Sequence, residues 1–234
     1  MKTYVIHVST AIDREKHMID QLNKKGLEGI FINQGDIKDL TLEVLDKYFS
    51  GVMKSAIGST SCPYKHILAY EQIQQSGEEY ALILEDDIFL EQNFLPGLKK
   101  IIFEIKERKL NNLIVSLEDS SLNYVKGSEL KNNYSLYKKN YGRMAAAYLV
   151  DRIAVQNMIK EIETNKCGWP IDWFHNYCSD KNIINIFWVH PTIAIQGSLN
   201  GQIKSLIDNS PSNYFRIISF KLQRVYKRIL WKLR

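Results

Sequence analysis

Cysteine is scarce in this 234-residue sequence, which contains only Cys62, Cys167 and Cys178. Without a Cys-x-x-Cys pair, they are too few and too scattered for a disulfide framework, so we expect a reducing compartment. Long apolar runs are also missing, since the longest mostly apolar stretch, residues 183–195, is interrupted by Asn, His, Pro and Thr. A spanning helix needs about 18–20 apolar residues. The sequence therefore predicts neither a disulfide scaffold nor a membrane-embedded chain.

The N-terminus lacks the pattern of a secretory leader. Residues 4–8 form a short apolar run that is soon followed by charge, which is typical of a first strand and not of a signal peptide. We therefore expect a cytoplasmic protein.

Acidic residues are missing from the end of the chain. The net charge is +5, but residues 216–234 carry seven basic residues and no acid, which leaves −2 for residues 1–215. A near-neutral body does not favour nucleic acid as a partner. Residues 214–234 are predicted to form a helix. Its apolar positions at helical spacing are Ile218, Leu222, Val225 and Ile229, and the basic positions beside them are Lys221, Arg224, Lys227 and Arg228.

Such a helix suits the interface of an anionic membrane without spanning it. We expect it to hold the protein peripherally on the inner face of the cytoplasmic membrane. The alternative is a terminal helix that packs its apolar stripe on the body and leaves its charges in water.

The order of predicted elements indicates an α/β fold. Residues 4–8, 10–25 and 29–32 are predicted as strand, helix and strand, which opens a parallel sheet. The continuous apolar run of residues 80–84 suits the centre of that sheet. Polar residues 118–142 are predicted as a flexible flap. We expect a Rossmann-type α/β domain over residues 1–213, with a central, mostly parallel sheet, followed by the amphipathic helix of residues 214–234.

Three adjacent carboxylates, Glu85, Asp86 and Asp87, directly follow the strongest predicted strand. Packed together they repel one another, and a divalent cation would stabilise them. Oxygen ligands favour Mg²⁺ or Mn²⁺, and ligands of open α/β sheets gather at the carboxyl ends of central strands. A solvated turn is the alternative interpretation. A Walker-type phosphate site is disfavoured because the G-x-x-x-x-G-K-[ST] motif is missing.

The sequence resembles glycosyltransferase family 25 over most of residues 3–200. The features that carry the resemblance are the β-α-β opening, Cys62-x-x-x-His66, Leu84-Glu-Asp-Asp87 and Pro170-x-Asp172. The family includes bacterial lipooligosaccharide galactosyltransferases and animal collagen galactosyltransferases. The resemblance implies a GT-A-like, nucleotide-sugar-binding fold and an inverting, metal-dependent enzyme that uses a UDP-sugar.

Further positions match the family's pattern: Asp13-Arg14, the Ala147-Tyr148-Leu149 strand, His190-Pro191 and Gln196. Ser61 and Lys65 depart from it, because the family has Gly and Ser at these positions.

The resemblance, together with the residue types beside the matched positions, suggests the following roles. The expected donor-binding residues are His7, Arg14, Glu85 and Asp86, and the expected ligands of Mn²⁺ or Mg²⁺ are Asp87, Asp86 and His190. Trp169, Trp173 and Gln196 are the expected acceptor-binding residues. Asp172 lies among aromatic residues and is the candidate general base that takes the proton of the attacking hydroxyl. Its alternative role is to cap a helix that begins at Trp173.

The predicted function is the transfer of a hexose, galactose first and glucose second, from UDP to a lipooligosaccharide, lipopolysaccharide or related glycan acceptor. Two alternatives belong to other classes. One is a non-catalytic nucleotide- or glycan-binding module whose acids hold Ca²⁺. The other is a metal-dependent nucleotidyltransferase or phosphohydrolase.

Overall fold

The structure is a computed structural model that describes residues 1–200, 203 and 214–233. Its strands are β1 (Lys2–Ile6), β2 (Gly29–Ile32), β3 (Tyr80–Glu85), β4 (Ile88–Leu90), β5 (Leu113–Ser116), β6 (Leu136–Lys139), β7 (Ala147–Asp151), β8 (Asn185–Val189) and β9 (Ala194–Gln196). Its α-helices are α1 (Ile12–Asn23), α2 (Leu42–Tyr48), α3 (Gly58–Ser76), α4 (Phe94–Glu107), α5 (Arg152–Asn165), α6 (Ile171–Asp180), α7 (Gly197–Asn200) and α8 (Tyr214–Leu233). Short 3-10 turns are η1 (Ile37–Asp39), η2 (Gly51–Met53) and η3 (Gly127–Glu129).

One large sheet has the order β2-β1-β3-β7-β5-β8-β6, and β4 pairs with β9 in a second, small sheet. Strands β1, β2, β3, β5 and β8 run in one direction, whereas β7 and β6 run against their neighbours. The α/β class, the mostly parallel central sheet and the C-terminal helix are thus confirmed. The predicted domain boundary at residue 213 stays a prediction.

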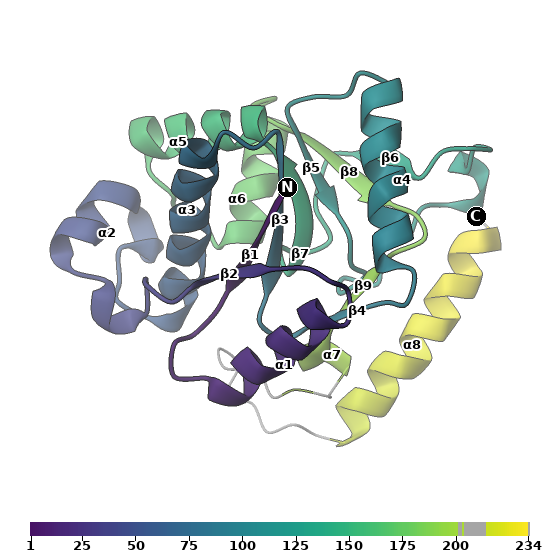
Figure 1. Ribbon diagram of the computed structural model, residues 1–234, viewed down its shortest axis with the longest axis horizontal. Coiled ribbons are helices and arrows are strands. Elements are labelled where there is room, and N and C mark those ends of the chain that lie inside the picture. Colours follow the sequence, from purple (N-terminus) through teal and green to yellow (C-terminus); the bar gives the residue numbers. More distant parts are fainter. Residues whose placement is uncertain (201–202, 204–213, 234) are drawn as a thin grey trace.

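Helices cover both faces of the large sheet, and each face has its own apolar core (Figure 1). Along β3, Ala81 and Ile83 face the core under α3, α5 and α6, whereas Leu82 and Leu84 face the core under α1 and α4. This alternation follows from the two-residue period of a strand. The strand is therefore buried on both sides, between β1 and β7 in the sheet.

Helix α3 runs from Gly58 to Ser76. Its first turn is anchored by side chains, because Thr60 Oγ1 donates to the Met53 carbonyl (3.1 Å) and Ser61 Oγ donates to the Gly35 carbonyl (2.7 Å). At its other end, Gly77 adopts the left-handed conformation (φ 71°) that glycine favours after a helix. The helix therefore presents its N-terminal turns to the segment that follows β2.

The polar segment 118–142 is not a flap throughout, since its second half contains β6, which pairs antiparallel with β8. The buried carboxylate of Glu104 on α4 accepts hydrogen bonds from the backbone N–H groups of Ser135 (2.6 Å) and Leu136 (3.2 Å). A buried acid thus fixes the start of a strand whose own side chains carry little apolar signal.

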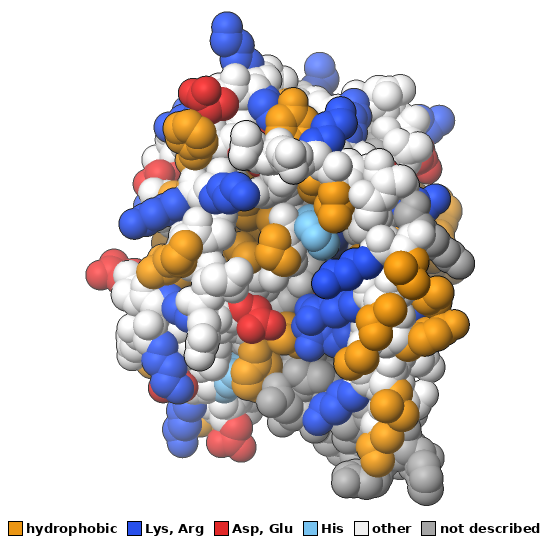
Figure 2. All heavy atoms as spheres, turned by 90° about the vertical axis from the view of Figure 1, so that its right-hand side faces the viewer, with side chains coloured by type: hydrophobic (Ala, Val, Ile, Leu, Met, Phe, Trp, Pro, Cys, Tyr) orange, Lys and Arg blue, Asp and Glu red, His pale blue; other side chains and the backbone are white. Residues whose placement is uncertain are grey.

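Helix α8 lies along the outside of the body with its apolar stripe in solvent (Figures 1 and 2). The stripe residues are between 40% and 66% exposed, namely Ile218, Leu222, Val225 and Ile229. Two basic side chains face inward instead: Arg224 Nε lies 2.9 Å and Arg228 Nη2 lies 3.0 Å from Oδ2 of the buried Asp119. The alternative that the helix packs its apolar stripe on the body is therefore wrong.

None of the helices in residues 1–200 and 214–233 is both long enough and apolar enough to cross a bilayer.

Candidate active site

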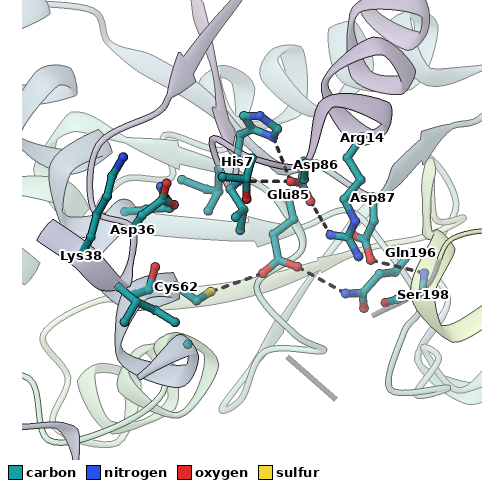
Figure 3. Close-up of a pocket in the computed structure, with 18 residues that line it drawn as sticks. His7, Arg14, Asp36, Lys38, Cys62, Glu85, Asp86, Asp87, Gln196 and Ser198 are labelled. Carbon is teal, nitrogen blue, oxygen red and sulfur yellow. Dashed lines mark hydrogen bonds and ion pairs between the residues drawn. The ribbon is translucent and has the colours of Figure 1, made fainter. Parts of the chain in front are cut away.

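A cavity of about 480 Å³ opens where the carboxyl ends of β1, β2 and β3 meet (Figure 3). This volume lies in the range typical of small-ligand sites. Its walls come from the turn after β1, the segment after β2, the first turns of α3, the acidic triplet after β3, and the start of α7. Of the sequence-predicted residues, His7, Arg14, Glu85, Asp86, Asp87 and Gln196 line it.

Asp86 is held by His7, which directly follows β1, and by Arg14 on α1. Its Oδ2 lies 3.0 Å from His7 Nδ1 and accepts from the Val8 N–H (3.3 Å), while Arg14 Nη1 donates to its Oδ1. Burial alone would raise the pKa of Asp86, but the His7 hydrogen bond and the Arg14 charge outweigh it and hold the pKa below its usual value. Asp86 is therefore an anion that fixes Arg14 at the cavity wall.

Asp87 is the carboxylate with an open coordination position. Its Oδ2 accepts from the Ser198 N–H (3.3 Å), and its Oδ1 is buried without a hydrogen-bond partner among the residues described. Burial raises the pKa of Asp87, and the charge of Asp86 adds to that effect against the hydrogen bond of Ser198. A divalent cation would satisfy this oxygen, so the residues present fit Mn²⁺ or Mg²⁺.

Glu85 points between α3 and β9 (Figure 3). Its Oε2 accepts from Gln196 Nε2 (3.3 Å), and its Oε1 lies 3.9 Å from both Cys62 Sγ and His66 Nε2. Burial raises the pKa of Glu85, and the charges of Asp87 and Asp86 raise it further. Gln196, predicted as an acceptor residue, thus lies in the same cavity as the predicted donor residues.

Asp36 is a cavity residue that the sequence pattern does not predict. It follows β2 by four positions, and its carboxylate accepts from Ser9 Oγ and lies 2.9 Å from Lys65 Nζ. Burial would raise the pKa of Asp36, but these two partners lower it. In dinucleotide-binding folds an acid after the second strand hydrogen-bonds the ribose. The position of Asp36 shortly after β2 is therefore the signal by which the sequence could have indicated it.

Lys65, which departs from the family pattern, is only 1% exposed and also donates to the Gln34 carbonyl (2.9 Å). The departure therefore builds the wall of the cavity through an ion pair with Asp36.

The predicted acceptor side lies at the N-terminus of α6. Asp172 is in the first turn of a helix whose N-cap is Pro170, so the alternative role as the N-cap is wrong. Burial raises the pKa of Asp172, against hydrogen bonds from backbone N–H groups. Asp172 is not among the described residues that line the cavity. The pKa of Cys62 is raised first by burial, next by the charge of Glu85 and then by the charge of Asp172. Trp169 and Trp173 are 49% and 63% exposed beside it.

His190 directly follows β8, and its ring packs edge-on against Tyr137. It is not among the described residues that line the cavity, and burial and the charges of Arg143, Lys232 and Arg228 lower its pKa. Its predicted role as a metal ligand stays a prediction. A different group of three candidate ligands, Cys62, His66 and Glu85, has its ligand atoms within 4.8 Å of one another.

The chain is similar to known proteins. The family described as glycosyltransferase family 25 (LPS biosynthesis protein) matches residues 1–175. The human inactive glycosyltransferase 25 family member 3 is 22% identical over 184 residues, which cover 74% of this chain and 31% of that protein. The chain thus spans about a third of this curated relative.

Two solved structures are also similar. A protein from STIV matches at a TM-score of 0.43 and 11% identity, covering 81% of this chain and 82% of its own. The inositol-1-phosphate CTP transferase from T. maritima matches at a TM-score of 0.39 and 11% identity, covering 94% of this chain and 96% of its own.

The chain combines a mostly parallel α/β domain with a cluster of acids at the end of β3. It belongs to glycosyltransferase family 25, whose model matches three quarters of it.

Proposed function

We propose that the protein transfers a hexose with inversion from a UDP-sugar, galactose before glucose, to a lipooligosaccharide, lipopolysaccharide or related glycan acceptor. The observation that carries the proposal is the unpartnered, buried Asp87 Oδ1 beside Glu85 and Asp86 in a cavity at the end of β3. Membership of the family supports the reaction class. The donor sugar and the acceptor are proposals.

The donor is proposed to lie across the ends of β1, β2 and β3. Asp36 accepts hydrogen bonds from the ribose hydroxyls, and His7 lies near the uracil ring. Arg14, oriented by Asp86, faces the diphosphate and offsets its negative charge. Asp87, with Asp86 beside it, would hold Mn²⁺ or Mg²⁺, which supplies Lewis-acid stabilisation of the leaving diphosphate when bound.

The acceptor is proposed to approach from the N-terminus of α6. Exposed Trp169 and Trp173 offer aromatic faces on which sugar rings stack. The acceptor hydroxyl gives its proton to the Asp172 carboxylate as its oxygen attacks the anomeric carbon, and the bond to the diphosphate breaks. Burial raises the pKa of Asp172, which makes the carboxylate a better base.

The proposal is tested with the purified full-length chain and a panel of UDP-sugars, each with and without Mn²⁺. We expect thermal stabilisation by UDP-galactose that depends on Mn²⁺, and slow release of UDP without an acceptor. Binding of Ca²⁺ and glycan without UDP release would favour the binding module. Turnover of a nucleoside triphosphate or a phosphate ester would favour the nucleotidyltransferase or phosphohydrolase.

We also propose that α8 holds the protein peripherally on an anionic membrane, at the inner face of the cytoplasmic membrane where a lipid-linked acceptor would reside. The support is the orientation of the helix, whose apolar stripe is exposed while Arg224 and Arg228 are anchored to Asp119. Lys221 lies next to the stripe and is exposed to acidic headgroups. Figure 2 shows hydrophobic side chains in a row along this side of the molecule.

A further inference from the structure

Two side chains of α3 and the end of β3 bring three unlike metal-ligating atoms together. Cys62 and His66 are four positions apart on the helix and so share one face. Glu85 Oε1 lies 3.9 Å from Cys62 Sγ and 3.9 Å from His66 Nε2, and all three ligand atoms lie within 4.8 Å of one another. A small inward movement of the side chains would close them around an ion with ligand distances of about 2.0–2.3 Å.

His66 Nε2 is buried and, within the described residues, lacks a hydrogen-bond partner, although it faces Glu85. Leaving a buried polar atom without a partner is costly, and bound ligands are a common explanation. Glu85 is also suited to bind an ion through Oε1 alone, because Gln196 Nε2 engages its Oε2.

A buried hydrogen-bond chain fixes the other side of the His66 ring. His66 Nδ1 lies 2.8 Å from Tyr148 OH, Tyr148 OH lies 2.7 Å from Tyr70 OH, and Tyr70 OH lies 2.7 Å from His175 Nε2. Each hydroxyl has one proton, so when Tyr70 donates to His175, Tyr148 donates to Tyr70 and His66 Nδ1–H donates to Tyr148. In this order Nε2 keeps its lone pair and directs it toward Glu85. Metal-binding histidines are typically held by such a second hydrogen bond.

We propose that Cys62 Sγ, His66 Nε2 and Glu85 Oε1 form a site for a soft divalent ion of the Zn²⁺ type, with its fourth position open to the cavity. Thiolate and imidazole ligands select such ions, whereas the all-oxygen position at Asp87 suits Mn²⁺ or Mg²⁺. The Cys62 thiol releases its proton to water as the sulfur–metal bond forms. The site is independent of the proposed glycosyl transfer, since it requires no sugar or nucleotide.

The test uses Co²⁺ as a coloured substitute for Zn²⁺ and the full-length protein under reducing conditions. We expect one Co²⁺ per chain, a thiolate-to-cobalt absorption band in the near ultraviolet, and loss of that band when Zn²⁺ is added. Cys62→Ser removes the band, and His66→Gln weakens binding. Tyr148→Phe keeps all three ligands but weakens affinity by roughly 10-fold, as loss of a second-shell partner typically does.

The matched control is Cys178→Ala, which removes a buried thiol on α6 outside the cavity and keeps the band. Asp87→Asn also keeps the band, even where it abolishes glycosyl transfer, so failure of the two proposals is distinguishable. The inference is overturned when wild-type protein gives no thiolate band with Co²⁺. It is equally overturned when the band survives in Cys62→Ser. Loss of the band in Asp87→Asn would also overturn it, because the ion would then be bound at the acidic triplet.

Discussion

Lys65 Nζ and Asp36 Oδ1 lie 2.9 Å apart in the wall of the cavity, with the lysine side chain 1% exposed and the aspartate side chain 11% exposed. The two residues are 29 positions apart in the sequence, and their ion pair joins α3 to the segment after β2. A buried pair is not by itself strong evidence for stability, but removing one partner leaves an uncompensated charge.

Lys65→Met is expected to destabilise the fold by about 3–5 kcal/mol, because the Asp36 carboxylate stays buried without its cation. Urea unfolding measures the loss, and Lys99→Met on the exposed side of α4 is the control. The double variant Lys65→Met/Asp36→Asn should recover part of the loss. Simple addition of the two single losses would show that the pair is not coupled.

The same pair predicts a pH dependence. The pKa of Asp36 is lowered in the folded chain, because Ser9 and Lys65 outweigh burial. A lowered pKa stabilises the fold fully above the ordinary carboxyl value of about 3.9, and the contribution is lost as the pH falls through the lower folded-state pKa. The difference in unfolding free energy between wild type and Asp36→Asn should therefore be constant near neutral pH and shrink below about pH 4. A difference that grows on acidification would contradict the assignment.

Asp87→Asn is expected to abolish detectable transfer while the protein stays folded, because the amide cannot supply the anionic oxygen that a divalent cation needs. UDP release in the presence of Mn²⁺ is the measurement, with thermal unfolding as the check on folding. Asp46→Asn on α2, an exposed acid outside the cavity, is the control. Retention of most of the activity would remove Asp87 from the donor site.

Asp172→Asn is expected to lower kcat by roughly 10²-fold or more and to leave UDP affinity nearly unchanged, since base catalysis is worth about 10²–10⁴. Because burial raises the pKa of Asp172, the acid limb of the wild-type kcat profile should lie above about 3.9. Asp180→Asn, at the other end of α6, should behave as wild type. Collapse of UDP affinity in Asp172→Asn would place this residue on the donor side instead.

The sequence predicts those parts of the site that are local. Glu85, Asp86 and Asp87 are neighbours after an apolar strand, and their place at the carboxyl end of an inner strand follows from the pattern of β3. Asp36 and Lys65 were not selected, because their pairing depends on how α3 packs against the segment after β2. No local pattern reports such a contact, and Asp36 stands in a polar stretch of ordinary composition.

The same limit applies to the fold. Strand β6 contains Lys138 and Lys139, and its place at the sheet edge explains why it carries charge and was missed. The helical period predicted α8, but not which face turns inward. That choice depends on the buried Asp119, which lies 105 positions before Arg224 and accepts its hydrogen bond.

The exposed stripe of α8 gives the final prediction. Leu222→Gln and Ile229→Gln should each weaken binding to vesicles that contain phosphatidylserine by about 10-fold, since a buried leucine or isoleucine is worth about 1.5 kcal/mol or more. Sedimentation with vesicles measures this binding, and Gln223→Asn, a polar change on the same helix, is the control.

Deletion of residues 216–234 should release the protein from the vesicles yet spare its activity on a soluble acceptor. Because lysines near an anionic surface contribute about 1 kcal/mol each, binding should also fall with salt. If the wild-type protein does not bind such vesicles at low salt, the proposed membrane binding by α8 is wrong.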